Sequence, residues 1–192
     1  MSISKDTIEQ NKVEVIRLLS GTRRQGIDDL VEWLEDETDF FSSPASSRID
    51  RHGCYEGGLA EHSLNVYQLF SERASELGLG IKKDEVTIAS LLHDLCKVNM
   101  YTPKAAEKVR ASDKKMYDIS DSFPLGHGEK SVYYAMRYIR LTDKEALLIR
   151  WHMGSYDPSW EKNINYVERV CPEIQAFHHC DHDASLYLDG KE

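Results

Sequence analysis

Hydrophobic residues recur at helical spacing along most of this chain. In one segment, Ile27, Leu30, Val31 and Leu34 lie three or four positions apart, which places them on one face of a helix. The same kind of pattern predicts helices over residues 5–19, 25–38, about 59–77, about 84–98, about 128–140, 143–153 and about 172–188. The chain is therefore expected to be largely helical.

Two segments depart from this pattern. Residues 40–58, FFSSPASSRIDRHGCYEGG, are rich in Ser, Gly and Pro and are typical of a loop. Residues 108–126 favour a short β-hairpin with Ser112-Asp113 in its turn. Its strand-forming residues are expected to be Val109, Met116, Tyr117 and Ile119. The predicted fold class is all-α, with one small β-hairpin insertion.

Length and composition indicate one globular domain over residues 1–192. Of the 192 residues, 41% are hydrophobic and 30% are charged, which is enough for a sizeable core. Four scattered cysteines without a CxxC pair indicate buried thiols and argue against a zinc ribbon or a disulfide framework.

The net charge of -9 argues against long nucleic acid as the main ligand, because such binders usually present a basic face. A small phosphorylated substrate held by a local cation remains compatible with this charge. The sequence has no apolar run of about 18 residues, so no membrane span is expected. Its first residues are polar where a secretory signal needs an apolar core, so a cytoplasmic location is expected.

Several polar residues fall on apolar helix faces. His62 lies three positions after Leu59 and four before Val66, on the face that both residues predict to be buried. A single histidine in such a position is more often a hydrogen-bonded core residue than a metal ligand. The position of His62 alone therefore does not identify a metal site.

The segment LLHDLCK, residues 91–97, also places polar residues on a predicted helix that is otherwise apolar. Apolar residues surround most of the predicted helix 84–98, and one narrow polar stripe contains Asp94 and Lys97. A buried carboxylate without a partner costs several kcal/mol or takes up a proton. Pairing of Asp94 with Lys97 at i,i+3 would satisfy both charges but leaves His93, about 100° away on the helix, unexplained.

Asp181 repeats this pattern on the last predicted helix, four positions after the apolar Phe177. Two inward aspartates and at least two inward histidines are hard to satisfy with hydrogen bonds alone. A divalent cation would neutralise the carboxylates and bind the imidazole nitrogens together. His127 in PLGHGEKS and His152 in IRWHMG join this set by their positions at predicted helix ends.

The order of these residues resembles the HD-domain metal-dependent phosphohydrolase superfamily. The resemblance covers about residues 45–188 and rests on four pieces in order, GGLAEHS, LLHDLCK, FPLGHGEKS and RWHMG. It implies an HD-domain helical bundle with a metal site at its centre. We therefore expect the domain core at about 45–188, with the helices of residues 1–40 packed on it.

The resemblance also implies roles for individual residues. The first metal ligands would be His62, His93, Asp94 and Asp181. His127 and His152 match the extra histidines of members with two metals, in which Asp94 would bridge both ions. Lys97 stands where the lysine of the family's HDxGK motif approaches substrate phosphate, and His52 resembles an additional histidine of some branches, here assigned to substrate binding.

The chain departs from the family pattern at Cys96, where glycine is common. The helical pattern predicts that Cys96 faces the core as a packing residue. His178 and His182 have the i,i+4 spacing of a chelating pair, but a supporting or surface role is favoured because the other set already completes a site.

The implied activity is hydrolysis of a phosphate ester of a small, nucleotide-like substrate through a metal-activated water. Asp94 and Lys97 are the expected catalytic residues, with one or two divalent transition metal ions as cofactors. The His/carboxylate set suits iron, manganese, cobalt or nickel, and also admits magnesium or zinc. The tip of the predicted hairpin is expected to reach the pocket mouth.

Two alternatives remain open. The first is a phosphodiesterase or 3′–5′ exonuclease acting on cyclic or short oligonucleotides, because GGLAEHS and PLGHGEKS also resemble the HD domains of an exoribonuclease group. The second is a non-catalytic metal- or ligand-binding regulatory module, against which the retention of every expected ligand and of Lys97 argues. Oxygenase chemistry at a di-iron site ranks below both.

Overall fold

A computed structural model describes residues 3–105 and 112–190 of the chain. The helices are α1 (Lys5–Gly21), α2 (Ile27–Asp36), α3 (Gly58–Glu76), α4 (Lys83–Leu92), α5 (His127–Met136), α6 (Asp143–Trp151), α7 (Trp160–Val170) and α8 (Ile174–Asp183). The strands are β1 (Tyr101–Pro103) and β2 (Tyr117–Ile119), and the short helical turns are η1 (Leu95–Lys97), η3 (Gly154–Tyr156) and η4 (Ala184–Leu188). The predicted all-α fold class is confirmed.

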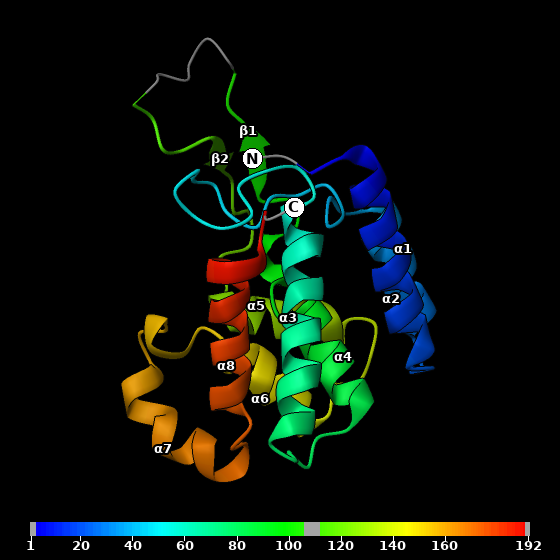
Figure 1. Ribbon diagram of the computed structural model, residues 1–192, viewed down its shortest axis with the longest axis vertical. Coiled ribbons are helices and arrows are strands. Elements are labelled where there is room, and N and C mark those ends of the chain that lie inside the picture. The colour runs from blue at the N-terminus through cyan, green and yellow to red at the C-terminus, as the bar shows by residue number, and fades with distance from the viewer. Residues whose placement is uncertain (1–2, 106–111, 191–192) are drawn as a thin grey trace.

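Helix α3 is the central element of the bundle (Figure 1). It packs against α4 and α8, and α1 covers another part of it. Phe70 of α3 and Phe177 of α8 meet edge to face, with ring centroids 4.9 Å apart, and both are fully buried. Burial of an aromatic side chain of this kind contributes about 1.5–3 kcal/mol, so this contact holds two helices of the later site together.

The first two helices share the core of the later ones. Leu19 of α1 and Leu30 of α2 are fully buried and belong to the same hydrophobic cluster as Leu59 of α3 and Ile88 of α4. Figure 1 shows α1 and α2 side by side along one flank of the bundle. The expected packing of residues 1–40 on the later helices is compatible with this cluster.

The predicted helix 84–98 is shorter than expected. Helix α4 ends at Leu92, Asp94 leaves helical geometry with φ -105° and ψ 19°, and Leu95–Lys97 form a 3-10 turn. The polar stripe persists across the break, because side chains at i and i+3 eclipse in a 3-10 turn. The break therefore keeps Asp94 and Lys97 together while the chain changes direction.

The predicted hairpin is present with a different first strand. Tyr101 pairs with Ile119 and Pro103 with Tyr117 in antiparallel register. Tyr117 and Ile119 lie in β2 as predicted, but the partner strand begins at Tyr101, well before Val109, which falls outside the described residues. The prediction placed the first strand too late because residues 101–103 lie between the predicted helix 84–98 and the predicted hairpin 108–126 and were assigned to neither.

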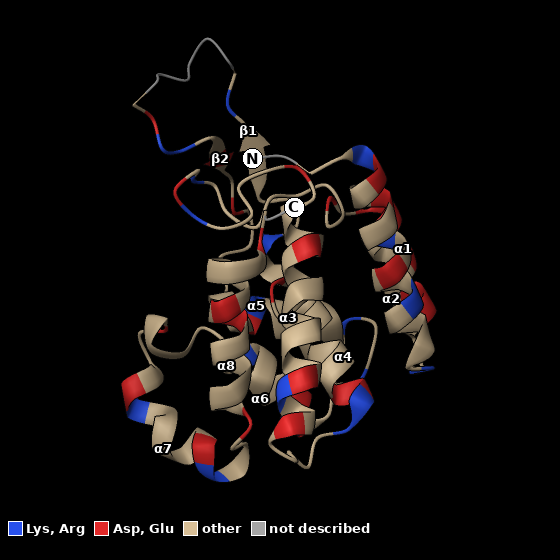
Figure 2. Cartoon of the chain, viewed as in Figure 1, with Lys and Arg blue, Asp and Glu red and all other residues tan. Residues whose placement is uncertain are grey.

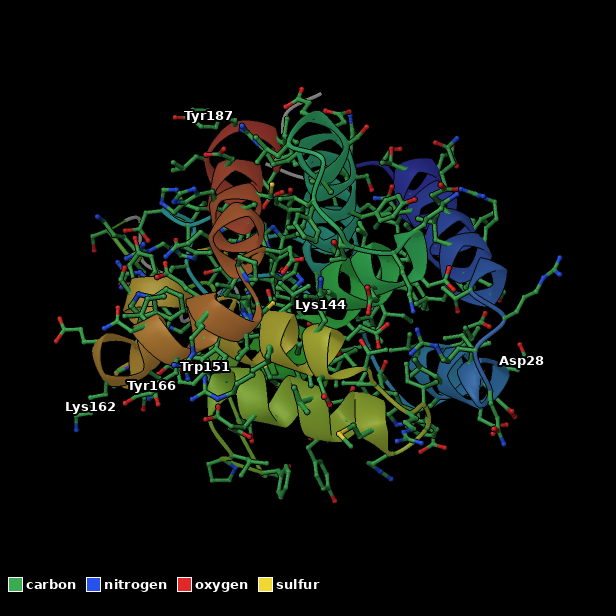
Figure 3. All side chains as sticks on the ribbon, turned by 90° about the horizontal axis from the view of Figure 1, so that it is seen from below. Asp28, Lys144, Trp151, Lys162, Tyr166 and Tyr187 are labelled. Carbon is green, nitrogen blue, oxygen red and sulfur yellow. The ribbon has the colours of Figure 1, made fainter. Side chains whose placement is uncertain are left out.

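Helix α7 was not predicted. Its buried residues, Trp160 and Val167, are seven positions apart, which is helical spacing that polar neighbours obscured. Acidic and basic residues both lie along α1 and α7, whereas every charged residue of α2 is acidic (Figure 2). Figure 3 shows Asp28 and Lys162 at opposite edges of the molecule, both pointing outward.

Candidate metal centre

The six predicted ligands come from the ends or faces of five segments of the bundle. His62 lies in α3, His93 caps the C-terminus of α4, and Asp94 follows it. The remaining three are His127 at the start of α5, His152 at the C-cap of α6, and Asp181 in α8. The structure brings all six together in overlapping groups whose ligand atoms lie within 4.8 Å of one another.

Two helix ends orient imidazoles in the same way. The Nδ1 atom of His93 lies 2.8 Å from the carbonyl oxygen of Ser90, and Nδ1 of His152 lies 2.7 Å from the carbonyl oxygen of Ile149. A carbonyl oxygen only accepts, so Nδ1 carries the proton in both rings. Each helix end thereby satisfies one orphan carbonyl and leaves the Nε2 lone pair of its histidine facing inward.

The first group of ligand atoms contains His62, His93, Asp94 and Asp181. The Nε2 atom of His62 lies 3.0 Å from Oδ1 of Asp181 and 3.3 Å from Nε2 of His93. The Nε2 atom of His93 lies 3.4 Å from Oδ2 of Asp94 and 3.8 Å from Oδ1 of Asp181. Two imidazole nitrogens and two carboxylate oxygens therefore converge on one buried point.

The second group is built on the other oxygen of the same aspartate. Oδ1 of Asp94 lies 2.8 Å from Nε2 of His127 and 3.6 Å from Nε2 of His152. Because Oδ2 faces the first group and Oδ1 faces the second, Asp94 stands between them. This is the arrangement that a carboxylate bridging two cations requires.

An independent observation also indicates that these ligand atoms suit a cation. The Nε2 atom of His152 is buried and has no hydrogen-bond partner among the described residues. Its Nδ1 already carries the proton, so a lone pair points at the carboxylate of Asp94. A lone pair facing an anion is unfavourable, and a bound cation between the two converts it into two favourable contacts.

The pKa values of the site indicate that its buried carboxylates need additional positive charge. Burial lowers the pKa of His62, but the charges of Asp189 and Asp181 outweigh it and raise that pKa to about 10. Burial likewise opposes the charged form of Asp94, yet Lys97 and His93 hold its pKa well below the usual range. In the absence of metal, protons on imidazoles therefore compensate the buried carboxylates.

Lys97 makes the i,i+3 contact that the sequence suggested. It is buried, and its Nζ donates to Oδ2 of Asp94 at 2.6 Å. Burial lowers the pKa of Lys97, but the carboxylate of Asp94 more than offsets this and raises it above the ordinary value. Lys97 is therefore a permanent cation at the edge of the first group.

A cavity of about 920 Å³ opens onto this centre. The loop 45–55 forms one wall, and Asp94, Lys97 and His127 lie at its base. Gly58 anchors the loop on α3, because a Cβ atom there would stand 2.3 Å from the carbonyl oxygen of Gly53. The residues just before β2 also hold this loop, since the Ile49 amide donates to the Lys114 carbonyl at 2.7 Å.

His52 projects from this loop over the centre. Its ring centroid lies 4.8 Å from that of His62, and its Nε2 is buried without a hydrogen-bond partner among the described residues. Burial lowers the pKa of His52 to about 4, so its imidazole is neutral at pH 7. His52 thus offers the cavity a neutral imidazole.

Two features of the site, the contact of Cys96 with His127 and the position of Asp189, escaped sequence reasoning. Cys96 is buried as expected, but its Sγ also lies 3.4 Å from both ring nitrogens of His127, so it contacts the site. His178 supports His152 by donating from Nδ1 to its carbonyl oxygen at 2.7 Å, whereas His182 is exposed. Asp189, which no motif indicated, faces His62.

The fold and the site together define a class of protein. The HD domain family matches residues 59–184, which is more than half of the 192 residues. The chain therefore belongs to the HD domain family, as its motifs predicted. HD domains bind divalent metals, and the groups around His62, His93 and Asp94 could hold one.

One curated relative gives this family match a chemical context. The chain is 29% identical over 140 residues to a protein of Methanocaldococcus jannaschii named dihydroneopterin 2′,3′-cyclic phosphate phosphodiesterase. The alignment covers 70% of this chain and 51% of the relative, so the chain spans about half the relative's length. The search of solved structures found no significant match. Within residues 3–105 and 112–190, no helix has the length and apolar character needed to cross a membrane.

Proposed function

We propose that the chain is a metal-dependent phosphohydrolase that cleaves a phosphate ester of a small, nucleotide-like molecule, with a cyclic phosphodiester as the preferred substrate. The observation that carries this proposal is the position of Asp94. Its two oxygens face two histidine groups, and its carboxylate also lines the 920 Å³ cavity beside Lys97. The name of the archaeal relative supports the cyclic phosphodiester.

We assign the ligands in two groups. One ion would be held by His62, His93, Asp94 and Asp181, and a second by Asp94, His127 and His152. Bound divalent ions polarise the phosphate and make a water molecule a better nucleophile near neutral pH. A ligand set that mixes imidazole and carboxylate suits iron, manganese, cobalt or nickel.

The protein's own groups then bind and orient the phosphate. The Nζ atom of Lys97 is a fixed cation next to Asp94 and places positive charge beside the non-bridging phosphate oxygens. The neutral imidazole of His52 lines the cavity above the same region and can donate one hydrogen bond to the phosphate. Asp94 orients the attacking water and accepts its proton.

In this reaction water adds its oxygen to phosphorus, and one ester P–O bond of the cyclic phosphate breaks. The leaving oxygen, which belongs to the organic part of the substrate, takes a proton, and the product is a phosphomonoester. No electrons are transferred, and no second substrate besides water is consumed. The site therefore needs only to hold the phosphate and a water molecule in line with the leaving oxygen.

The rest of the cavity suits an organic group larger than phosphate. Its volume of about 920 Å³ exceeds the space that phosphate alone occupies and lies in the range of small-molecule sites. Tyr101 and Tyr156 line it, and the side chain of Tyr156 is exposed, so each can offer a ring face to a flat heterocycle. Arg51 on the loop wall adds a cation for a further polar group.

A panel of phosphate esters tests the proposal. We expect protein loaded with manganese or cobalt to hydrolyse 2′,3′-cyclic nucleotide phosphates, and Asp94→Asn to lose this turnover. Asp183→Asn, an aspartate near the end of α8 that lies outside every ligand group, is the matched control and should retain it. Turnover of phosphomonoesters alone would identify a phosphomonoesterase, and cleavage of short linear oligonucleotides would favour the exonuclease. Metal binding without any turnover would favour the regulatory module.

A further inference from the structure

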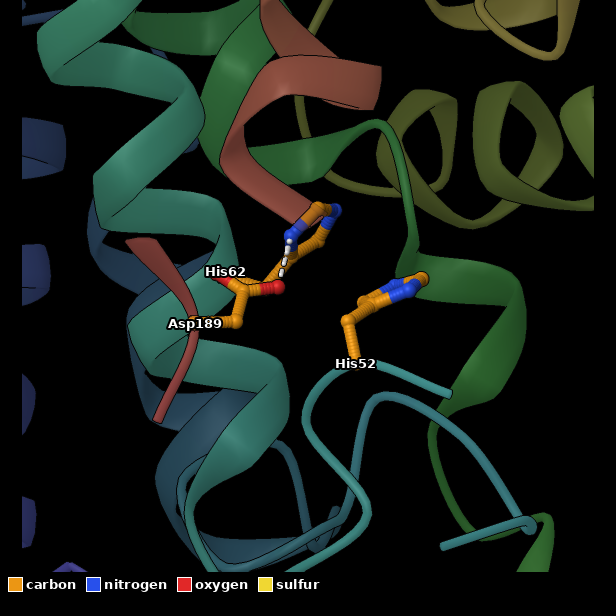
Figure 4. Close-up of side chains that lie close together, drawn as sticks. All are labelled: His52, His62 and Asp189. Carbon is orange, nitrogen blue, oxygen red and sulfur yellow. Dashed lines mark hydrogen bonds and ion pairs between the residues drawn. The ribbon is translucent and has the colours of Figure 1, made fainter. Parts of the chain in front are cut away.

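A carboxylate near the C-terminal end of the described chain contacts the proposed metal ligand His62 on its outer ring nitrogen. Asp189 is buried, and its Oδ2 lies 2.9 Å from Nδ1 of His62 (Figure 4). Asp181 contacts the other ring nitrogen, with its Oδ1 3.0 Å from Nε2. Its other oxygen, Oδ1, accepts a hydrogen bond from Nδ2 of Asn65 at 2.9 Å. Both carboxylate oxygens are therefore occupied by groups of α3.

The backbone that presents this carboxylate is itself unusual. Helix α8 continues into η4, a π-helical turn over Ala184–Leu188, and the Asp189 amide donates to the Ala184 carbonyl at 3.1 Å. A π-helical turn is rare and is found frequently at functional sites. Here it brings Asp189 back onto α3, eight positions after Asp181, so that one segment contacts both nitrogens of His62.

We propose that Asp189 is a positioning residue for His62, fixing the ring with its proton on Nδ1 so that the Nε2 lone pair faces the first metal. This inference rests on the metal centre of the proposed function. A carboxylate that accepts from the outer nitrogen of a metal-bound histidine locks the tautomer and the ring plane and makes the inner nitrogen a stronger donor. Asn65 holds Asp189 in turn, so the chain of contacts runs from α3 through η4 back to α3.

A different reading of the same residues is less consistent with the geometry. His52, His62 and Asp189 also bring ligand atoms within 4.8 Å of one another and could be taken as a separate metal site. Such a site would use Nδ1 of His62, so the ring could also bind the first metal through Nε2 only after losing both protons. A hydrogen bond from Nδ1 to Asp189 needs only the ordinary neutral ring.

Metal affinity measured directly tests the role of Asp189. In calorimetric titrations with manganese, we expect Asp189→Asn and Asp189→Ala to bind about 10–100-fold more weakly than the wild type, as is typical for loss of such a partner. When loaded with cobalt, the two variants should show visible absorption bands that differ from those of the wild type, because the His62 ring is no longer held in one orientation. Asp183→Asn, six positions earlier and outside the ligand groups, should behave as wild type.

Asn65→Ala serves as the second variant, because it removes the support of Asp189 without removing the carboxylate. We expect it to fold and to weaken manganese binding less than the Asp189 variants do. Wild-type affinity and an unchanged cobalt spectrum in Asp189→Asn would overturn the inference while leaving the proposed hydrolysis intact. Weakened metal binding in a protein that hydrolyses no phosphate ester would support the inference and reject the proposed function. A wild-type protein that binds neither metal would reject both.

Discussion

Replacement of Lys97 by methionine should separate the stability of the protein from its activity. In the metal-free protein, Nζ of Lys97 lies 2.6 Å from Oδ2 of Asp94, and both side chains are buried. Removal of one partner of a buried ion pair costs about 3–5 kcal/mol, because the other charge is left uncompensated. Asp94 keeps His127 at 2.8 Å, so we expect the lower end of this range, about 3 kcal/mol.

Metal should remove most of that cost. A cation bound at Asp94 neutralises the carboxylate, and methionine fills much of the volume of the lysine stem, so the remaining loss should be about 1 kcal/mol. The difference of about 2 kcal/mol must reappear as tighter metal binding, since the two effects form one thermodynamic cycle. It corresponds to an affinity about 30-fold higher in Lys97→Met than in the wild type. Loss of the cation beside the phosphate should meanwhile lower kcat about 100-fold.

Urea unfolding with EDTA and with saturating manganese, calorimetric manganese titrations and kcat for a cyclic phosphodiester provide the three readouts. Lys130→Met is the matched control, because Lys130 is also buried and paired, with Asp121 at 2.7 Å, but lies outside the ligand groups. It should be destabilised equally with and without metal and keep its kcat. The reasoning is refuted if Lys97→Met loses the same stability in both conditions and binds manganese as the wild type does.

Three further changes follow from the same structure. In the two-metal site that we propose, His152→Ala should lower the metal content measured by elemental analysis from two ions to one per chain, because the unpaired Nε2 of His152 faces the proposed second ion; two retained ions would exclude that role. Glu173→Gln should destabilise the protein at pH 7, because burial raises the pKa of Glu173 but its ion pair with Lys144 and nearby hydrogen bonds outweigh burial and lower that pKa below 4.5. This loss of stability should disappear as the pH falls through the lowered pKa, and a pH-independent loss in thermal unfolding would contradict the reasoning. Replacing residues 114–116 by Gly-Ser-Gly should change the relative rates for different phosphodiesters, because this segment pairs with the loop that lines the cavity, and an unchanged profile would remove the support.

Much of the fold was predictable because the helices bury one continuous face. The spacing of Ile27, Leu30 and Leu34 predicts α2 without any tertiary knowledge, and all three are buried. The same reasoning missed the end of α4, because Leu91, Leu92 and Leu95 continue the apolar pattern through a break in the backbone. Hydrophobic periodicity reports which side chains are buried, and a short 3-10 turn preserves burial while changing the path of the chain.

The candidate site was predictable where a polar residue interrupted an apolar stripe. Asp181 and His62 stood out in this way, and the structure places them 3.0 Å apart although 119 positions separate them. Asp189 gave no such signal, because it follows a π-helical turn whose register no helical pattern anticipates. The contact of Cys96 with His127 was hidden for a related reason, since the break after α4 turns the thiol toward α5.

The geometry of the centre follows from the ends of helices more than from their faces. His93 and His152 both stand at C-caps and both donate Nδ1–H to a carbonyl three residues earlier, so each terminates its helix and aims Nε2 with one hydrogen bond. A carbonyl at a helix C-terminus needs a donor, and an imidazole that supplies it loses the freedom to rotate or to change tautomer. His62 lies within α3, where the backbone carbonyls are already bonded, so its outer nitrogen requires a side-chain acceptor instead. Asp189 supplies that acceptor, which explains why one imidazole of the first group needs a buried carboxylate behind it and the other does not.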